Sequence, residues 1–84
     1  MPTTREDIQR WMDRRNENDT HLIIVTDTFD YEEYPVFVKN TEDVSNKVNE
    51  YNSKSMQNVM EVYSFTGKYS IESQLKEYRS YHLD

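Results

Sequence analysis

The amino-acid sequence predicts an α+β fold with the element order α-β-β-α-β-α and a three-stranded, mainly antiparallel sheet. Three short apolar runs rich in β-branched and aromatic residues predict the strands, and three segments with apolar residues three or four positions apart predict the helices. The most apolar strand should be central, which gives the strand order 2-1-3, and we expect the helices to pack on one face. With 84 residues, the chain has room for one small domain, residues 1–84.

The N-terminal segment predicts a helix. Thr3 or Thr4 can cap it, and Glu6 or Asp7 can complete a capping box. The helix should end in the polar run 16–19. Its core-facing stripe consists of Ile8, Trp11, Met12 and Arg15.

Two strands should follow as a hairpin. Residues 22–25 form an unbroken apolar run, which predicts a central strand covered on at least one face. Residues 34–38 predict the second strand, and Pro35 places it at the edge of the sheet because proline cannot donate to a ladder. The acidic segment between the two strands should form a long tip.

The second half of the chain predicts the remaining elements. We expect a helix after Thr41, a strand over residues 59–65, a turn at Gly67 and a last helix after Ser70. The core-facing stripes of the two helices are Val44, Val48 and Tyr51, and Ile71, Leu75 and Tyr78.

The net charge of −6 comes from the middle of the chain. Residues 17–50 hold nine acids against two lysines, whereas residues 51–84 hold four of each sign. Such a surface repels nucleic acid and anionic membrane and attracts basic protein surfaces. The same acidity also serves solubility, and the charge pattern alone does not separate the two roles.

The segment 26–35 is the strongest candidate for a binding surface. It puts four carboxylates and three aromatic rings into ten residues, which is more than a turn needs. Acids in this segment can pair with arginine or lysine of a partner, with Tyr31 as the anchor. As a plain solvated loop, it would fold Phe29 or Tyr34 onto the core, and we expect at least one of these rings to do so. The predicted binding residues are Asp27, Phe29, Asp30, Tyr31, Glu32, Glu33 and Tyr34.

No pattern indicates catalysis, a cofactor or a metal site. The chain has no cysteine, and its single glycine excludes a glycine-rich phosphate loop. The acids lack the spacing of a calcium-binding loop, and His21 and His82 belong to no ligand pattern. We therefore expect no enzymatic activity, no cofactor and no metal. Without a secretion signal or a long apolar run, the chain reads as a soluble cytoplasmic protein.

Residues 21–38 resemble small, uncharacterised bacteriophage and prophage proteins. The likeness lies in the apolar strand, the run from Asp27 to Tyr31 and the Tyr-Pro-Val that follows; residues 56–63 and Gln74-Leu75 look like the second half of the same family. The resemblance implies a phage protein acting in the host cytoplasm. Small acidic phage proteins often bind and block host proteins, CRISPR effectors and other antiviral systems among them, so an anti-CRISPR-like role is implied.

These observations favour a non-enzymatic protein that binds a basic host protein and inhibits or modulates it, without contacting nucleic acid or membrane. One alternative is a small-molecule binder, such as a nucleotide sponge or sensor. Another is a virion assembly protein. The seven tyrosines also allow a homodimer that hides some of their rings.

Overall fold

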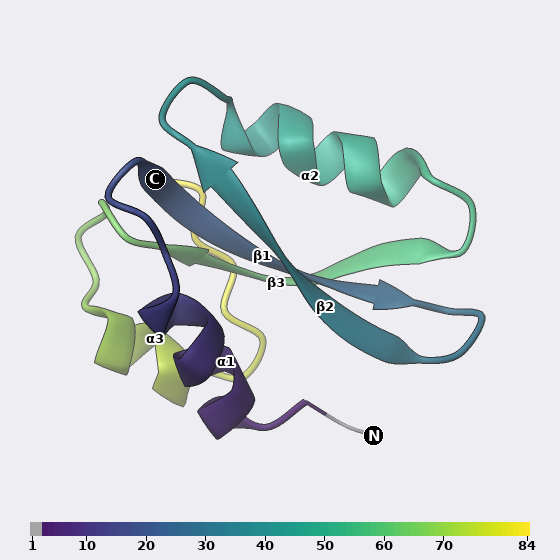
Figure 1. The fold of residues 1–84 in the computed structure, drawn as a ribbon, viewed down its shortest axis with the longest axis horizontal. Helices are drawn as coiled ribbons and strands as arrows, with labels where there is room; N and C mark the ends of the chain where they lie inside the picture. The colour runs from purple at the N-terminus through teal and green to yellow at the C-terminus, as the bar shows by residue number, and fades with distance from the viewer. Residues whose placement is uncertain (1–2) are drawn as a thin grey trace.

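The structure is a computed structural model that describes residues 3–84. Figure 1 shows the elements α1 (Arg5–Asp13), β1 (Asp19–Asp27), β2 (Glu32–Lys39), α2 (Val44–Ser53), β3 (Gln57–Ser64) and α3 (Ile71–Lys76). The sheet has the order β2-β1-β3, and both outer strands run antiparallel to β1. The predicted α+β fold, element order and strand order are confirmed.

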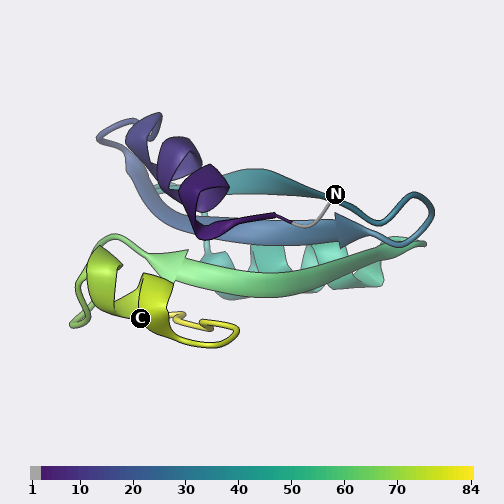
Figure 2. The same ribbon diagram turned by 90° about the horizontal axis from the view of Figure 1, so that it is seen from below.

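The helices cover both faces of the sheet, so the expectation that they pack on one face is wrong. Ile23 and Val25 of β1 face α2, whereas Leu22 and Ile24 face α1 and α3. Figure 2 shows α1 and α3 in front of the sheet and α2 behind it. The reason is in the run 22–25: it is apolar at every position, and alternate side chains of a strand point to opposite faces, so both faces need cover.

The N-caps of two of the three helices are the residues predicted from the sequence. Thr4 caps α1 in a capping box with Asp7, and Ser70 caps α3. The cap of α2 is Asp43 instead of the predicted Thr41, so this helix begins two residues later than expected. An aspartate carboxylate accepts from the backbone N–H groups of the first turn at least as well as a threonine hydroxyl does.

Two side chains predicted on core-facing stripes lie outside their helices. Because α3 ends at Lys76, Tyr78 falls in the following loop and is 85% exposed. Because α1 ends at Asp13, Arg15 lies in the next loop, with its guanidinium carbon 4.9 Å from the ring centre of Phe65. A periodic pattern predicts which side chains face the core only as far as the helix itself continues.

The segment after α3 lies along the outer edge of β3. The N–H of Val62 donates to the carbonyl of Ser80 at 2.9 Å, and the N–H of His82 donates to the carbonyl of Val62 at 3.0 Å. Gly67 lies under this segment and has no positive φ. A Cβ atom there would meet a carboxylate oxygen of Asp84 at 2.8 Å and the hydroxyl of Ser64 at 2.9 Å, so a larger residue at this position would displace these side chains.

Candidate functional site

The hairpin tip is built by the acids themselves. The N–H of Tyr31 donates to the carbonyl of Asp27 at 2.7 Å and closes a loop over residues 28–31. The Asp27 carboxylate accepts from the N–H of Phe29 at 2.9 Å, and the Asp30 carboxylate accepts from the N–H of Glu32 at 3.1 Å. Two of the four acids therefore also hold the backbone of the loop, as aspartate commonly does in turns.

The other two acids, Glu32 and Glu33, belong to strand β2. Glu33 accepts a hydrogen bond from the hydroxyl of Thr26 at 3.2 Å across the strand pair. Within residues 3–84, no lysine, arginine or histidine forms an ion pair with any acid of the tip. By contrast, Glu42 at the other end of β2 is held by Lys47 at 2.7 Å. The negative charge of the tip is thus uncompensated within the described structure.

Two aromatic rings of the tip point into solvent and one points into the core. Phe29 and Tyr31 are 76% and 75% exposed. Tyr34 is half-buried against the core, its hydroxyl donates to Gln57, and its ring meets that of Tyr51 edge-on at 6.5 Å. Burial raises the pKa of the Tyr34 hydroxyl, and Tyr51 and Asp27 add to that effect. The expectation that one of Phe29 and Tyr34 folds back is confirmed for Tyr34.

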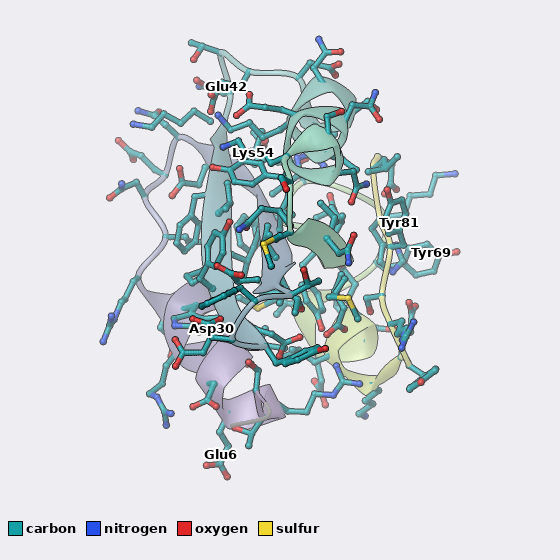
Figure 3. All side chains as sticks on the ribbon, turned by 90° about the vertical axis from the view of Figure 1, so that its right-hand side faces the viewer. Glu6, Asp30, Glu42, Lys54, Tyr69 and Tyr81 are labelled. Carbon is teal, nitrogen blue, oxygen red and sulfur yellow. The ribbon has the colours of Figure 1, made fainter. Side chains whose placement is uncertain are left out.

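A second loop completes this end of the molecule. The N–H of Thr28 donates to the carbonyl of Met56 at 2.8 Å, which sets the loop before β3 beside the hairpin tip. Met56 is 49% exposed. Its place at this end could not be predicted from the sequence, because Met56 lies 28 positions away from Thr28 and only strand pairing brings the two together. Figure 3 views the molecule from this end. It labels Asp30 and also Glu42, which lies beside α2 and well away from Asp30 in this view.

Tyr31 and Met56 share an uncommon backbone conformation. Their φ angles are 59° and 63°, in the left-handed region that glycine and asparagine adopt most easily. A side chain in this region costs about 1 kcal/mol or more. At this one end of the molecule, two large exposed side chains therefore occupy positions where glycine would be less strained. We call Phe29, Asp30, Tyr31, Glu32, Glu33 and Met56 the tip surface.

The histidines lie far from this surface in structural roles. His21 is buried in β1, with Nδ1 2.9 Å from the hydroxyl of Thr20 and Nε2 3.2 Å from a main-chain oxygen of Asp84. His82 Nε2 is 2.8 Å from the Glu77 carboxylate. In residues 3–84, no three His, Asp or Glu side chains gather in a way that could hold a metal ion.

Comparison with protein families, curated proteins and solved structures found no match to this chain. The resemblance of residues 21–38 to phage proteins therefore stays a prediction. No helix in residues 3–84 has the length and apolar character needed to cross a membrane.

Proposed function

We propose that this chain is a non-enzymatic, phage-encoded protein that docks its tip surface on a basic host protein and inhibits or modulates it. Components of antiviral defence are the expected partners. One observation carries the proposal: Tyr31 holds a 75% exposed ring at a left-handed backbone position, among carboxylates without an ionic partner in residues 3–84.

The charge of the tip surface supplies the attraction. Carboxylates without a cation beside them in their own chain attract a basic partner surface more strongly. Such electrostatic attraction raises the rate of association. Direct binding to nucleic acid is disfavoured, because phosphates would meet the same carboxylates. A basic groove that normally holds nucleic acid has the complementary charge.

The aromatic rings supply the anchor. Tyrosine is enriched at interface hot spots and phenylalanine in interface cores. Aromatic rings bury a large area with few rotatable bonds. Phe29 and Tyr31 are already turned outward in the free protein, so docking needs no rearrangement of their loop. Met56, on the adjacent loop, adds an exposed apolar side chain that is flexible enough to adapt to a partner.

The test is capture of partners from host lysate on the tagged protein at low and at high salt, followed by mass spectrometry. The proposal expects a basic protein that is retained at low salt and released at high salt. The test variant is Asp30→Asn, Glu32→Gln, Glu33→Gln, which removes three charges and keeps an acceptor oxygen on Asp30 for the N–H of Glu32.

A matched control carries the same change in net charge elsewhere. Glu6, Glu17 and Glu72 are exposed and lie on α1, on the loop before β1 and on α3. The variant Glu6→Gln, Glu17→Gln, Glu72→Gln should retain the partner, whereas the tip variant should lose it. Equal retention by both variants, or a partner that neither salt nor the tip variant releases, would overturn the proposal.

A further inference from the structure

The sheet face that carries α1 and α3 is open at its hairpin end. On this face β1 places Leu22 and Ile24 under the two helices, and the next side chain in the alternation is Thr26. Glu33 lies opposite Thr26 on β2, and Glu61 lies opposite Ile24 on β3. In Figure 1 both helices lie at the far end of the sheet from the hairpin loop. The polar part of this face therefore has no helix over it.

A cleft of about 240 Å³ occupies this open end. Given that a water molecule takes about 30 Å³ of liquid, the cleft has room for a ligand of several heavy atoms. It lies between the sheet, the segment before α1 and the loop after α3. Its lining consists of Thr3, Arg5, Glu33, Met60, Glu61, Tyr78 and Arg79.

One pair of charges in the cleft is already satisfied within the protein. Nη1 of Arg5 lies 3.1 Å from the hydroxyl of Tyr63 and 3.5 Å from the Glu61 carboxylate, and Nη2 donates to the carbonyl of Glu77 at 2.6 Å. The Tyr63 hydroxyl donates to Glu61 at 2.6 Å, and the Tyr63 side chain is fully buried. Burial first, and then the bond to Glu61, raise the pKa of Tyr63, so this hydroxyl remains a donor. Arg5 and Glu61 thus line one side of the cleft as an ion pair with no net charge, held in place by hydrogen bonds to Tyr63 and Glu77.

Two opposite charges remain open in the same cleft. Arg79 and Glu33 form no ion pair with each other or with another residue of the described chain. Arg79 follows the exposed Tyr78, its guanidinium carbon lies 5.5 Å from the ring centre of Tyr78, and its φ is 56°. The cleft therefore presents a guanidinium and a carboxylate, neither of which has an ionic partner in residues 3–84.

We propose that this cleft binds a small zwitterion, of the class of free α-amino acids. The ligand carboxylate would pair with Arg79 and its ammonium group with Glu33, while Met60 and Tyr78 contact its side chain. A purely anionic ligand would be attracted by Arg79 but repelled by Glu33. A purely cationic ligand would be attracted by Glu33 but repelled by Arg79. A nucleotide carries two or more negative charges and suits this lining least.

The proposal does not rest on the tip surface as a protein-docking site. Only Glu33 belongs to both, and Arg79 belongs to the cleft alone. The variant Arg79→Gln should therefore bind the small ligand about tenfold more weakly and keep the captured host protein, so the failure of either proposal leaves the other intact.

The test is a titration of the whole chain, labelled with ¹⁵N, against the common α-amino acids one by one. We expect saturable shifts of the amides that line the cleft for at least one amino acid. The N-acetylated form of that amino acid, which lacks the ammonium group, and its amide, which lacks the carboxylate, should each bind about tenfold more weakly. Arg79→Gln and Glu33→Gln should each weaken the binding of the zwitterion by a similar factor.

The matched controls are Arg14→Gln and Glu17→Gln, which make the same charge changes in exposed residues of the loop between α1 and β1. Both should bind like the unchanged protein. The proposal is overturned if no amino acid gives saturable shifts, if either blocked analogue binds as well as the zwitterion, or if Arg79→Gln keeps full affinity. Saturable binding of adenosine monophosphate at the cleft in place of an amino acid would also overturn it.

Discussion

The backbone N–H of Thr28 donates to the carbonyl oxygen of Met56 at 2.8 Å and joins two loops that are far apart in the sequence. This bond continues the pairing of β1 with β3 one step beyond Asp27 and Gln57. Because of it, the exposed rings of the hairpin tip and the exposed Met56 share one end of the sheet. A surface built from two loops on a rigid sheet holds its shape better than a single loop would.

Replacement of Tyr31 separates the stability of the tip from its proposed function. At φ 59°, glycine is less strained than any residue with a Cβ, so Tyr31→Gly should be about 1 kcal/mol more stable than Tyr31→Ala. Both variants lack the ring and should lose the captured partner to the same extent. Urea unfolding measures the first effect and partner capture the second; binding by either variant at full strength contradicts the anchoring role of Tyr31.

The charge of the tip should act on the association rate. For the captured partner, Asp30→Asn, Glu32→Gln, Glu33→Gln should slow association about tenfold at low salt and change dissociation little. The rate of the unchanged protein should fall steeply as ionic strength rises, because salt screens exposed charges. Stopped-flow or surface-binding kinetics measure both. A rate that is flat across ionic strength excludes electrostatic steering.

The fold could be predicted from the sequence because its main determinants are local. The run 22–25 is apolar at every position and is the natural central strand, and its neighbours along the chain supply the partners. The same run also contained the evidence for cover on both faces, since a strand buried on one face only would alternate. The expectation that all three helices pack on one face of the sheet did not take this pattern into account.

The candidate site could be predicted only in part. The exposure of Phe29 and Tyr31 follows from their place in a loop, and the acids were evident from composition. The inward turn of Tyr34 depends on which face of β2 meets α2, and the place of Met56 depends on the pairing of β1 with β3. Contacts that depend on strand register over long separations are not encoded in any local pattern.

Gln74 is a buried clamp that sequence patterns did not reveal. It is fully buried, its Oε1 accepts from the N–H of Ser64 at 2.7 Å, and its Nε2 donates to the carbonyls of Ser64 and Tyr69 at 2.8 and 2.9 Å. Gln74→Leu would leave these backbone groups without partners and should lower the free energy of unfolding by about 3 kcal/mol. Gln9→Leu, on the exposed face of α1, should change it by less than about 0.5 kcal/mol. Urea unfolding of the two variants tests the difference. Similar decreases in the free energy of unfolding would contradict the stabilising role of the Gln74 hydrogen bonds.

The start of α2 gives a direct comparison of two candidate caps. The Asp43 carboxylate accepts from the N–H of Asn46 at 3.3 Å, whereas Thr41 lies two residues before it outside the helix. Asp43→Ala should therefore lower the free energy of unfolding by about 1 kcal/mol, and Thr41→Ala should change it by less than about 0.5 kcal/mol. Thermal or urea unfolding measures both. The reverse order would show that α2 begins at Thr41 in solution.

His21 should make the stability depend on pH near neutrality. Burial lowers the pKa of its imidazole below the ordinary 6.5, and the hydrogen bond and charge of Asp84 oppose that effect without cancelling it. As pH falls through 6.5, the unfolded chain takes up a proton before the folded chain does, so the free energy of unfolding should decrease until the lower folded pKa is passed.

The measurement is urea unfolding at pH 7.5, 6.5 and 5.5, a window above the titration of ordinary carboxylates. The unchanged protein should lose stability across this window, and His21→Gln should lose markedly less because it has no proton to gain at this position. His82→Gln makes the same substitution at the other histidine and is the comparison variant. If His21→Gln keeps the full slope, another group is responsible for the pH dependence.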